Sequence, residues 1–308
     1  MPNRNVMTTS QAPHAVNVTY HQAALKTLDK FIVFAVWGQE YQKPIHEGDT
    51  MKWSRWAALT PSTTPLPEVD DPAPILATRT DFSVQLLEYG AWMKISKWLQ
   101  MTGLGSTQAD LTERLSRQMA LSIDTLCRDV IAGCASTLTC SNGSGTATFP
   151  NKIDINTITK TLYSANAEMI TSRMGAASGQ GTSPLPAGYI GIMDAAGMNR
   201  LSAVPGFTFV KNYANPGSAY PQEYGQTGMV RWLLTNNGYT SGGYYYAPIM
   251  AQDFFGNVHM KAGENPLIYK SPEQLPSPLN RYATLGWDKP YAGKILNDLL
   301  AVNMLHTV

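Results

Sequence analysis

Residues 78–96 read TRTDFSVQLLEYGAWMKIS and carry the clearest strand signal in the chain. From Thr78 to Leu86, apolar or threonine side chains alternate with polar ones, a period of two that is typical of a β-strand. After Leu86 the alternation continues with the opposite parity as far as Ile95. One extra residue or a bulge near Leu86 would move the apolar side chains to the other face. We therefore predict one long strand that serves two different environments.

The first half of this strand is predicted to form a projecting hairpin, with residues 50–59 as its other arm. Residues 51–57 read MKWSRWA, and such aromatic-rich stretches favour strands. A proline-rich tip follows, in which no regular ladder can form. Its prolines are Pro61, Pro65, Pro67, Pro72 and Pro74. A two-stranded hairpin is marginal alone in water, so we expect it to lie on another surface.

Residues 107–132 form the best predicted helix. Its apolar side chains recur every three or four residues, which places them on one face. They are Leu111, Leu115, Met119, Ile123, Leu126 and Val130. Gly133 is placed to end the helix, whose length would be roughly 39 Å. We expect a spine helix packed on one sheet.

The rest of the chain mixes short helices and strands. Residues 1–30 are polar and are interpreted as an extended arm, and the loop at 140–150 is predicted to be a domain boundary. One helix is predicted around Ile158, Leu162, Ala165 and Met169, and another from an Asp194 N-cap to about Val204. Strands are predicted at 189–193, 207–210, 230–235, 243–251 and 281–287. Residues 296–302 carry no clear pattern. The fold class is therefore α+β.

Composition limits the classes of function. The chain has 308 residues, with 23 basic and 22 acidic side chains and a formal charge of +1. This balance excludes a polybasic nucleic-acid binder and an acidic disordered protein. Only 15% of the residues are charged, against about 25% in an ordinary soluble domain. We therefore expect other chains to cover much of the surface.

Neither a membrane span nor a secretory signal is predicted. The longest apolar run, residues 31–37, is far shorter than the ~20 residues that a membrane span needs. The first residues carry no apolar stretch typical of a signal peptide. The chain has three cysteines, Cys127, Cys134 and Cys140, an odd number without a Cys-x-x-Cys pair, so we predict buried thiols in a reducing compartment.

No motif for catalysis, cofactor binding or metal binding occurs in the sequence. A nucleophile elbow, a phosphate-binding loop and a zinc-protease helix are all missing, and the five histidines lie far apart. We therefore expect no enzyme and no cofactor. The aromatic and basic cluster of the hairpin is instead predicted to make contacts between subunits, since interface energy concentrates in aromatic residues. The candidates are Trp53, Arg55, Trp56 and Phe82; packing of the tryptophans within their own subunit is the alternative.

Several stretches together resemble a known protein family. Residues 86–96 read LLEYGAWMKIS and residues 118–129 read QMALSIDTLCRD. Residues 205–213 read PGFTFVKNY, and a Gly-x-x-Gly-x-x-Arg pattern follows at 225–231. PLNR and GWDK come near the end, at 278–281 and 286–289. In this order the stretches resemble the major capsid proteins of tailed phages with the Hong Kong 97 fold, in particular the coat protein family typified by phage N-four.

The resemblance implies a shell subunit, assembled in the host bacterial cytoplasm and located in the virion capsid, that encloses double-stranded DNA without sequence specificity. Its implied partners are copies of itself in hexamers and pentamers, a scaffolding protein, a portal and a decoration protein, without membrane contact. The implied parts are an N-terminal arm at 1–49, an extended hairpin loop at 50–86, a peripheral domain at 87–136 and 244–308, and an axial domain at 137–243.

Three alternatives stay open. A shell protein of an encapsulin-type compartment shares the fold class and would enclose cargo enzymes instead of DNA. A β-rich glycan-binding surface module would use exposed Trp and Tyr side chains to stack on sugars. A hydrolase would require a pocket with converging acid and base groups.

Overall fold

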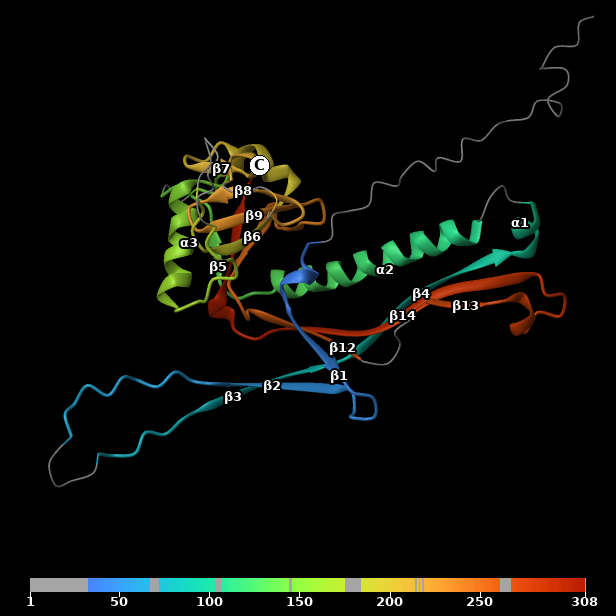
Figure 1. Cartoon of the computed structure of the whole chain (residues 1–308), viewed down its shortest axis with the longest axis horizontal. Coiled ribbons are helices and arrows are strands. Elements are labelled where there is room, and N and C mark those ends of the chain that lie inside the picture. The colour runs from blue at the N-terminus through green and yellow to red at the C-terminus, as the bar shows by residue number, and fades with distance from the viewer. Residues whose placement is uncertain are drawn as a thin grey trace, which may run out of the picture.

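The computed structural model describes residues 33–66, 72–102, 107–143, 146–174, 184–213, 215, 217, 219–260 and 267–307. The molecule is elongated (Figure 1). A compact domain around one sheet lies at one end, and a long helix with a second sheet extends away from it. A hairpin projects from the second sheet on the other side. The expected arm at 1–30 lies outside the described residues.

The second sheet has five strands, and its central strand is β14 (Tyr282–Ile295). One edge of β14 pairs along most of its length with β4 (Leu87–Ser96). Its other edge pairs first with β13 (Leu267–Lys270) and then with β12 (Phe255–Met260). β1 (Gln39–Lys43) joins β12 in parallel. From β1 onward, the chain therefore belongs to the body of the molecule.

The spine helix α2 runs over this sheet from Thr107 to Ala132, the range that the apolar spacing predicts. Leu115 of α2 packs with Ile95 of β4 and with Leu285 and Trp287 of β14. The indole N–H of Trp287 also donates to the Oε1 atom of Gln118, at 2.7 Å. The short helix α1 (Lys97–Thr102) follows β4 at the far end of the sheet.

The predicted change of parity occurs at Leu86. β3 (Arg79–Gln85) ends there and β4 begins at the next residue. The Leu86 side chain is buried, and its N–H donates to the carbonyl oxygen of Asp49 at 2.8 Å. Because this residue leaves the ladder, β3 pairs with β2 (Thr50–Trp56) in the hairpin while β4 pairs with β14 in the body.

The compact domain is built on an eight-stranded sheet. Along the sheet its strands are β5 (Thr137–Thr139), β15 (Ala301–His306), β11 (Tyr244–Met250), β6 (Tyr189–Asp194), β9 (Val230–Thr235), β8 (Glu223–Thr227) and β7 (Phe207–Phe209), and β10 (Tyr239–Ser241) pairs with β11. The helix α3 (Lys152–Ser164) packs on it through Ile155, Ile158 and Leu162. The expected domain boundary at residue 244 does not separate the two sheets. β11 and β15 both lie after this boundary, yet they hydrogen-bond into the eight-stranded sheet.

The remaining helices are short. Two of them follow β6: a 3-10 turn at Ala195–Gly197, which the Asp194 side chain caps, and α4 (Met198–Ser202). Within the described residues, further 3-10 turns lie at Ala35–Trp37, Val210–Asn212, Pro272–Gln274 and Asp298–Leu300. Met169 is not part of a helix, contrary to the prediction. α3 ends at Ser164, where Asn166 takes a left-handed conformation with φ of 54°.

Candidate assembly surfaces

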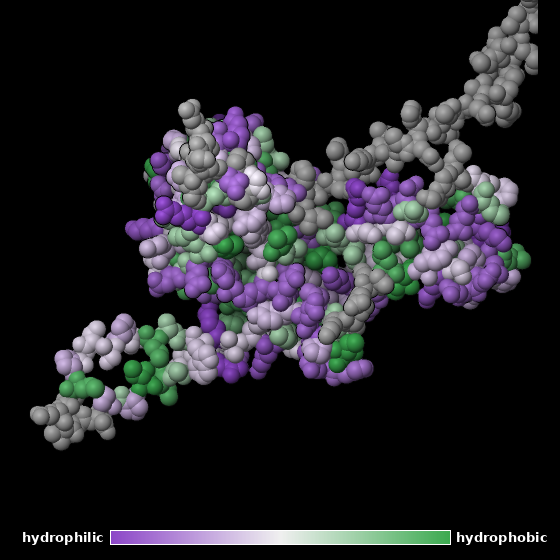
Figure 2. All heavy atoms as spheres, viewed as in Figure 1, coloured by the Kyte–Doolittle hydropathy of each residue, from purple (hydrophilic) through white to green (hydrophobic). Residues whose placement is uncertain are grey.

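The hairpin leaves the body as a two-stranded ribbon that no other described strand joins. β2 and β3 pair antiparallel from Thr50 and Gln85 at the root to Trp56 and Arg79 further out. The described residues beyond Ala57 and before Thr78 form neither helix nor strand. Figure 2 shows the ribbon standing apart from the body, with apolar surface along it. Its exposed apolar side chains are Trp56, Leu59, Leu66, Ile75 and Leu76.

The root of the hairpin is packed against its own chain. The Trp53 ring meets the Tyr41 ring edge to face, with centroids 5.6 Å apart. A Cβ atom on Gly256 would come within 3.1 Å of the same indole, so the glycine lets Trp53 lie on β12. Met51 and Val84 pack beside it against the buried side chains of Leu86, Val258 and Ala292. Trp53 thus joins the hairpin to the five-stranded sheet.

Of the other three contact candidates, Phe82 lies directly opposite Trp53 across the ribbon, and Arg55 and Trp56 follow further out along β2. Trp56 is 62% exposed. Phe82 is half-buried, and the Arg55 guanidinium lies 5.4 Å from the centre of its ring. Arg55 also donates to the carbonyl oxygen of Leu296 at 3.4 Å. Of the four candidates, Trp56 offers the most apolar surface to another molecule; contact of any of them with a second subunit stays a prediction.

A second junction fixes the start of the described chain. One carboxylate oxygen of Asp124, on α2, accepts the backbone N–H groups of Val33, Phe34 and Ala35 at 3.1, 2.7 and 3.0 Å. The other oxygen accepts the side-chain amide of Asn237 at 3.3 Å. Burial raises the pKa of Asp124, and the hydrogen bonds to Ala35 and Asn237 oppose that shift. This carboxylate therefore fixes residues 33–35, the start of the described chain, to the body of the molecule.

Asp124 was not among the predicted site residues. The sequence does contain an indication that Asp124 is buried. Cys127 and Ile131 follow it at three and seven residues, which places all three side chains on the same face of a helix. Both are buried, so a carboxylate on that face needs partners within the fold.

The buried cysteines form no reactive site. The Cys127 Sγ atom lies 2.8 Å from the Tyr291 hydroxyl, which donates to Asn257 at 2.7 Å. Burial raises the pKa of Cys127 to about 12, that of Cys134 to about 11 and that of Cys140 to about 12. These thiols therefore stay protonated, and a nucleophile requires the thiolate. The prediction that all three are buried free thiols is confirmed.

Within the described residues, no group of three or more His, Cys, Asp and Glu side chains is arranged to hold a metal ion. No described helix has the length and apolar character needed to cross a membrane.

The fold resembles that of several solved structures. No protein-family model matches the sequence, and no curated protein matches it. The capsid of Ralstonia phage GP4 is similar over 95% of this chain and 96% of its own, with a TM-score of 0.70 and 11% identity. The head structure of Helicobacter pylori bacteriophage KHP40 is similar over 99% and 98%, with a TM-score of 0.65 and 11% identity. The capsid of a native GTA particle gives 99% of both chains, a TM-score of 0.64 and 10% identity. The chain thus has the α+β fold of Hong Kong 97-type capsid proteins over nearly its whole length.

Proposed function

We propose that this protein is the major capsid protein of a tailed bacteriophage. Many copies would assemble into an icosahedral shell that encloses double-stranded DNA. The observation that carries the proposal is a ribbon with exposed Trp56, Leu66 and Leu76, which no other described strand of its own chain joins, in a chain with a capsid fold. An isolated two-stranded ribbon is marginally stable in water, so a neighbouring copy is the natural support.

In this proposal the parts of the molecule take different tasks. The eight-stranded sheet with α3 would be the axial domain, which gathers in hexamers and pentamers. The five-stranded sheet with α2 would be the peripheral domain, and residues 50–86 would be the extended hairpin loop that lies over a neighbour. Each subunit then makes several modest contacts, which accumulate in a closed shell.

A formal charge of +1 supports a wall that encloses DNA without binding it tightly. Tight binding to phosphates would require many clustered Lys and Arg side chains. We further propose a scaffolding protein, a portal and a decoration protein as partners, assembly in the host cytoplasm, and membership of the coat protein family typified by phage N-four. These proposals derive from the sequence resemblance.

The test is electron microscopy of the expressed protein, alone and together with the scaffold encoded beside it. We expect closed icosahedral particles. A monomer that stays monomeric with any such scaffold, at concentrations of tens of micromolar, would contradict the proposal. Particles that contain cargo enzymes and no DNA, when isolated from the native source, would favour an encapsulin-type compartment instead.

A further inference from the structure

Residues 33–38 lie at the joint between the two sheets. They precede β1 and contain the 3-10 turn Ala35–Trp37, and they belong to neither sheet. Figure 1 shows this segment in blue, beside the end of α2 that is nearest the compact domain. Val33 and Phe34 are nevertheless buried, at 3% and 2% exposed. A short segment outside both sheets thus fills space between them.

The buried cluster around Val33 and Phe34 draws side chains from three parts of the molecule. Its members include Ile190, Ile192, Leu233 and Met250 of the eight-stranded sheet, Phe255 and Tyr291 of the five-stranded sheet, and Cys127 and Ile131 of α2. Two domains of one chain are expected to move relative to each other unless their interface is large and apolar. Val33 and Phe34 therefore add apolar contact at the place where such motion would occur.

Hydrogen bonds connect the backbone of this segment to both α2 and the eight-stranded sheet. The Asp124 carboxylate, which accepts the three N–H groups of residues 33–35, also accepts the side-chain amide of Asn237, between β9 and β10. The same amide donates to the Thr125 hydroxyl at 3.2 Å, and Arg128 donates to the Asn237 side-chain oxygen at 3.1 Å. One buried carboxylate therefore connects the segment, the helix and a turn of the eight-stranded sheet.

Trp37 makes a second contact with the compact domain. Its ring meets the Tyr220 ring edge to face, with centroids 5.0 Å apart. The Tyr220 N–H donates to Glu223 at 2.9 Å, and the Arg231 guanidinium lies 4.8 Å from the centre of the Tyr220 ring. Glu223 and Arg231 form a buried bidentate ion pair with two N–O distances of 2.8 Å. Because such a pair has a specific geometry, Trp37 packs on a partner with a fixed position.

The segment is also held to the five-stranded sheet. The side-chain amide of Asn257, on β12, donates to the carbonyl oxygen of Ala35 at 3.2 Å. A Cβ atom on Gly38 would clash with the Asn257 side chain and would lie 2.6 Å from the Phe255 ring. The glycine therefore lets the chain pass close to β12 before β1 begins at Gln39 and pairs with it.

We infer that residues 33–38 are a strap that holds the two sheets in one relative orientation. Phe34 fills the joint, Asp124 anchors the strap on α2, and Trp37 connects it to the compact domain. This device is a property of the single subunit. Its consequence for the shell rests on the proposed function, because subunits of one fixed shape favour particles of one size.

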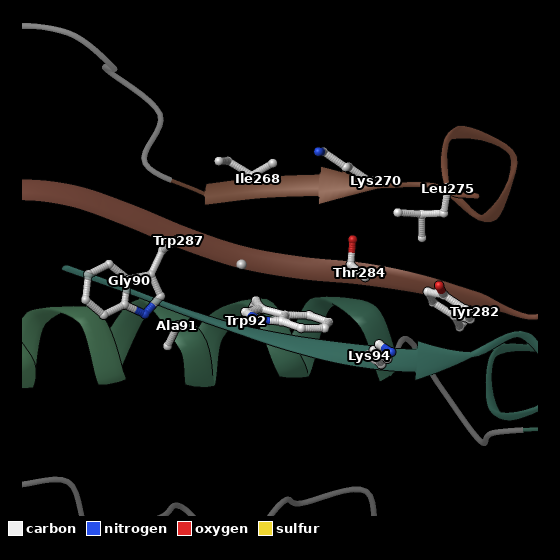
Figure 3. Close-up of a pocket in the computed structure, with 11 residues that line it drawn as sticks. Gly90, Ala91, Trp92, Lys94, Ile268, Lys270, Leu275, Tyr282, Thr284 and Trp287 are labelled. Carbon is white, nitrogen blue, oxygen red and sulfur yellow. The ribbon is translucent and has the colours of Figure 1, made fainter. Parts of the chain in front are cut away.

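Distances between two spin labels on the full-length subunit, below the concentration of assembly, test the strap. The labels are attached at Tyr163→Cys on α3 and at Ile268→Cys on β13, two exposed positions. Figure 3 shows Ile268 beside an open groove that Trp92, Lys94 and Tyr282 also line. This groove lies on the five-stranded sheet, away from the strap. The three native cysteines are buried, so the labels react with the introduced thiols.

The wild type should give one narrow distribution of distances. Phe34→Ala and Trp37→Ala should each at least double its width, because the two sheets can then change their relative orientation. If Phe34→Ala does not fold, Phe34→Leu takes its place. Leu162→Ala is the matched control, since it removes a buried side chain within the compact domain. It should lower the midpoint of urea denaturation without broadening the distribution. A broad distribution in the wild type, or strap variants as narrow as the control, would overturn the inference.

Amide hydrogen exchange tests the anchor. Asp124→Ala leaves the N–H groups of residues 33–35 without their acceptor, so they should exchange at least about tenfold faster than in the wild type. The control Asp129→Ala removes an exposed carboxylate of the same helix and should leave this exchange unchanged. Equal exchange in wild type and Asp124→Ala would overturn the anchor role.

Electron microscopy tests the consequence for the shell. Phe34→Ala should form particles of mixed size, and Leu162→Ala should form particles as uniform as those of the wild type. Wild-type chains that form no particles would contradict the proposed function alone, because the distances and the amide exchange are measured on single subunits.

Discussion

The root and the outer part of the hairpin contain similar residues in opposite situations. Trp53 lies at the root against Tyr41 and Gly256 of its own chain, whereas Trp56, three residues further, is 62% exposed. The stretch MKWSRWA places the two tryptophans on opposite faces of one strand, but it does not show which face meets the body. What separates them is the distance from the body and the face of the ribbon. Trp53 therefore attaches the ribbon to its own subunit, and contact with another subunit is the prediction for Trp56.

The largest expected effect is on assembly, from Trp56→Ala. An exposed aromatic anchor of an interface contributes about 2 kcal/mol or more, and the contact repeats in every subunit. The concentration needed for assembly should rise at least about tenfold, as measured by light scattering. The free energy of unfolding of the subunit should change by less than about 0.5 kcal/mol. Thr60→Ala, a polar truncation on the same ribbon, serves as the control. Normal assembly of Trp56→Ala would remove the distinction between root and outer ribbon.

The next effect is on folding stability, from Trp53→Ala. Truncation removes the ring from its packing with Tyr41 and β12 and leaves space at the root, which we expect to cost ~2 kcal/mol because the residue is half-buried. Urea denaturation measures the change. Trp53→Phe should retain most of the stability. If Trp53→Ala leaves the denaturation curve unchanged but blocks assembly, Trp53 contacts a neighbour as well and the two tryptophans are equivalent.

The sequence predicted the elements whose signals are local. The helix at 107–132 and the change of parity at Leu86 follow from residue spacing alone, and both are confirmed. β1, β12 and β13 are short strands without strong alternation, so only their partners within the sheet stabilise them as strands. The helix predicted as far as Met169 ends at Ser164, because apolar spacing continues past the point where the backbone turns.

The candidate surfaces were predictable to a lesser degree. The sequence indicated an aromatic hairpin, and it could not assign Trp53 to the body because the residues that pack on it, Tyr41 and Gly256, are far away in the chain. For the same reason the three N–H groups that surround Asp124 were not foreseen. The groove at Trp92 exists only after β4, β14 and β13 are placed side by side.

The buried carboxyl group of Asp124 makes the folding stability of the protein depend on pH. Its pKa is raised above the ordinary value of 3.8, so between 3.8 and the folded value the folded state binds more protons than the unfolded state. The contribution of this group to stability is then fully present below pH 3.8 and is lost as the pH rises through the folded pKa. Wild type should therefore gain stability relative to Asp124→Asn as the pH is lowered from 7 towards 4. Urea denaturation of both proteins at several pH values measures this, and a constant or opposite difference would contradict it.

The smallest effect is expected from the charged side of the ribbon. Asp81 lies 2.9 Å from Arg79 and 3.6 Å from Lys52, and its hydrogen bond with Arg79 lowers its pKa. All three side chains are solvent-exposed, and exposed ion pairs contribute little because water and salt screen them. Asp81→Asn should therefore leave both the melting temperature and the assembly concentration unchanged within error. If assembly fails while the melting temperature stays constant, the contact with the neighbour includes the charged side of the ribbon as well as the Trp56 side.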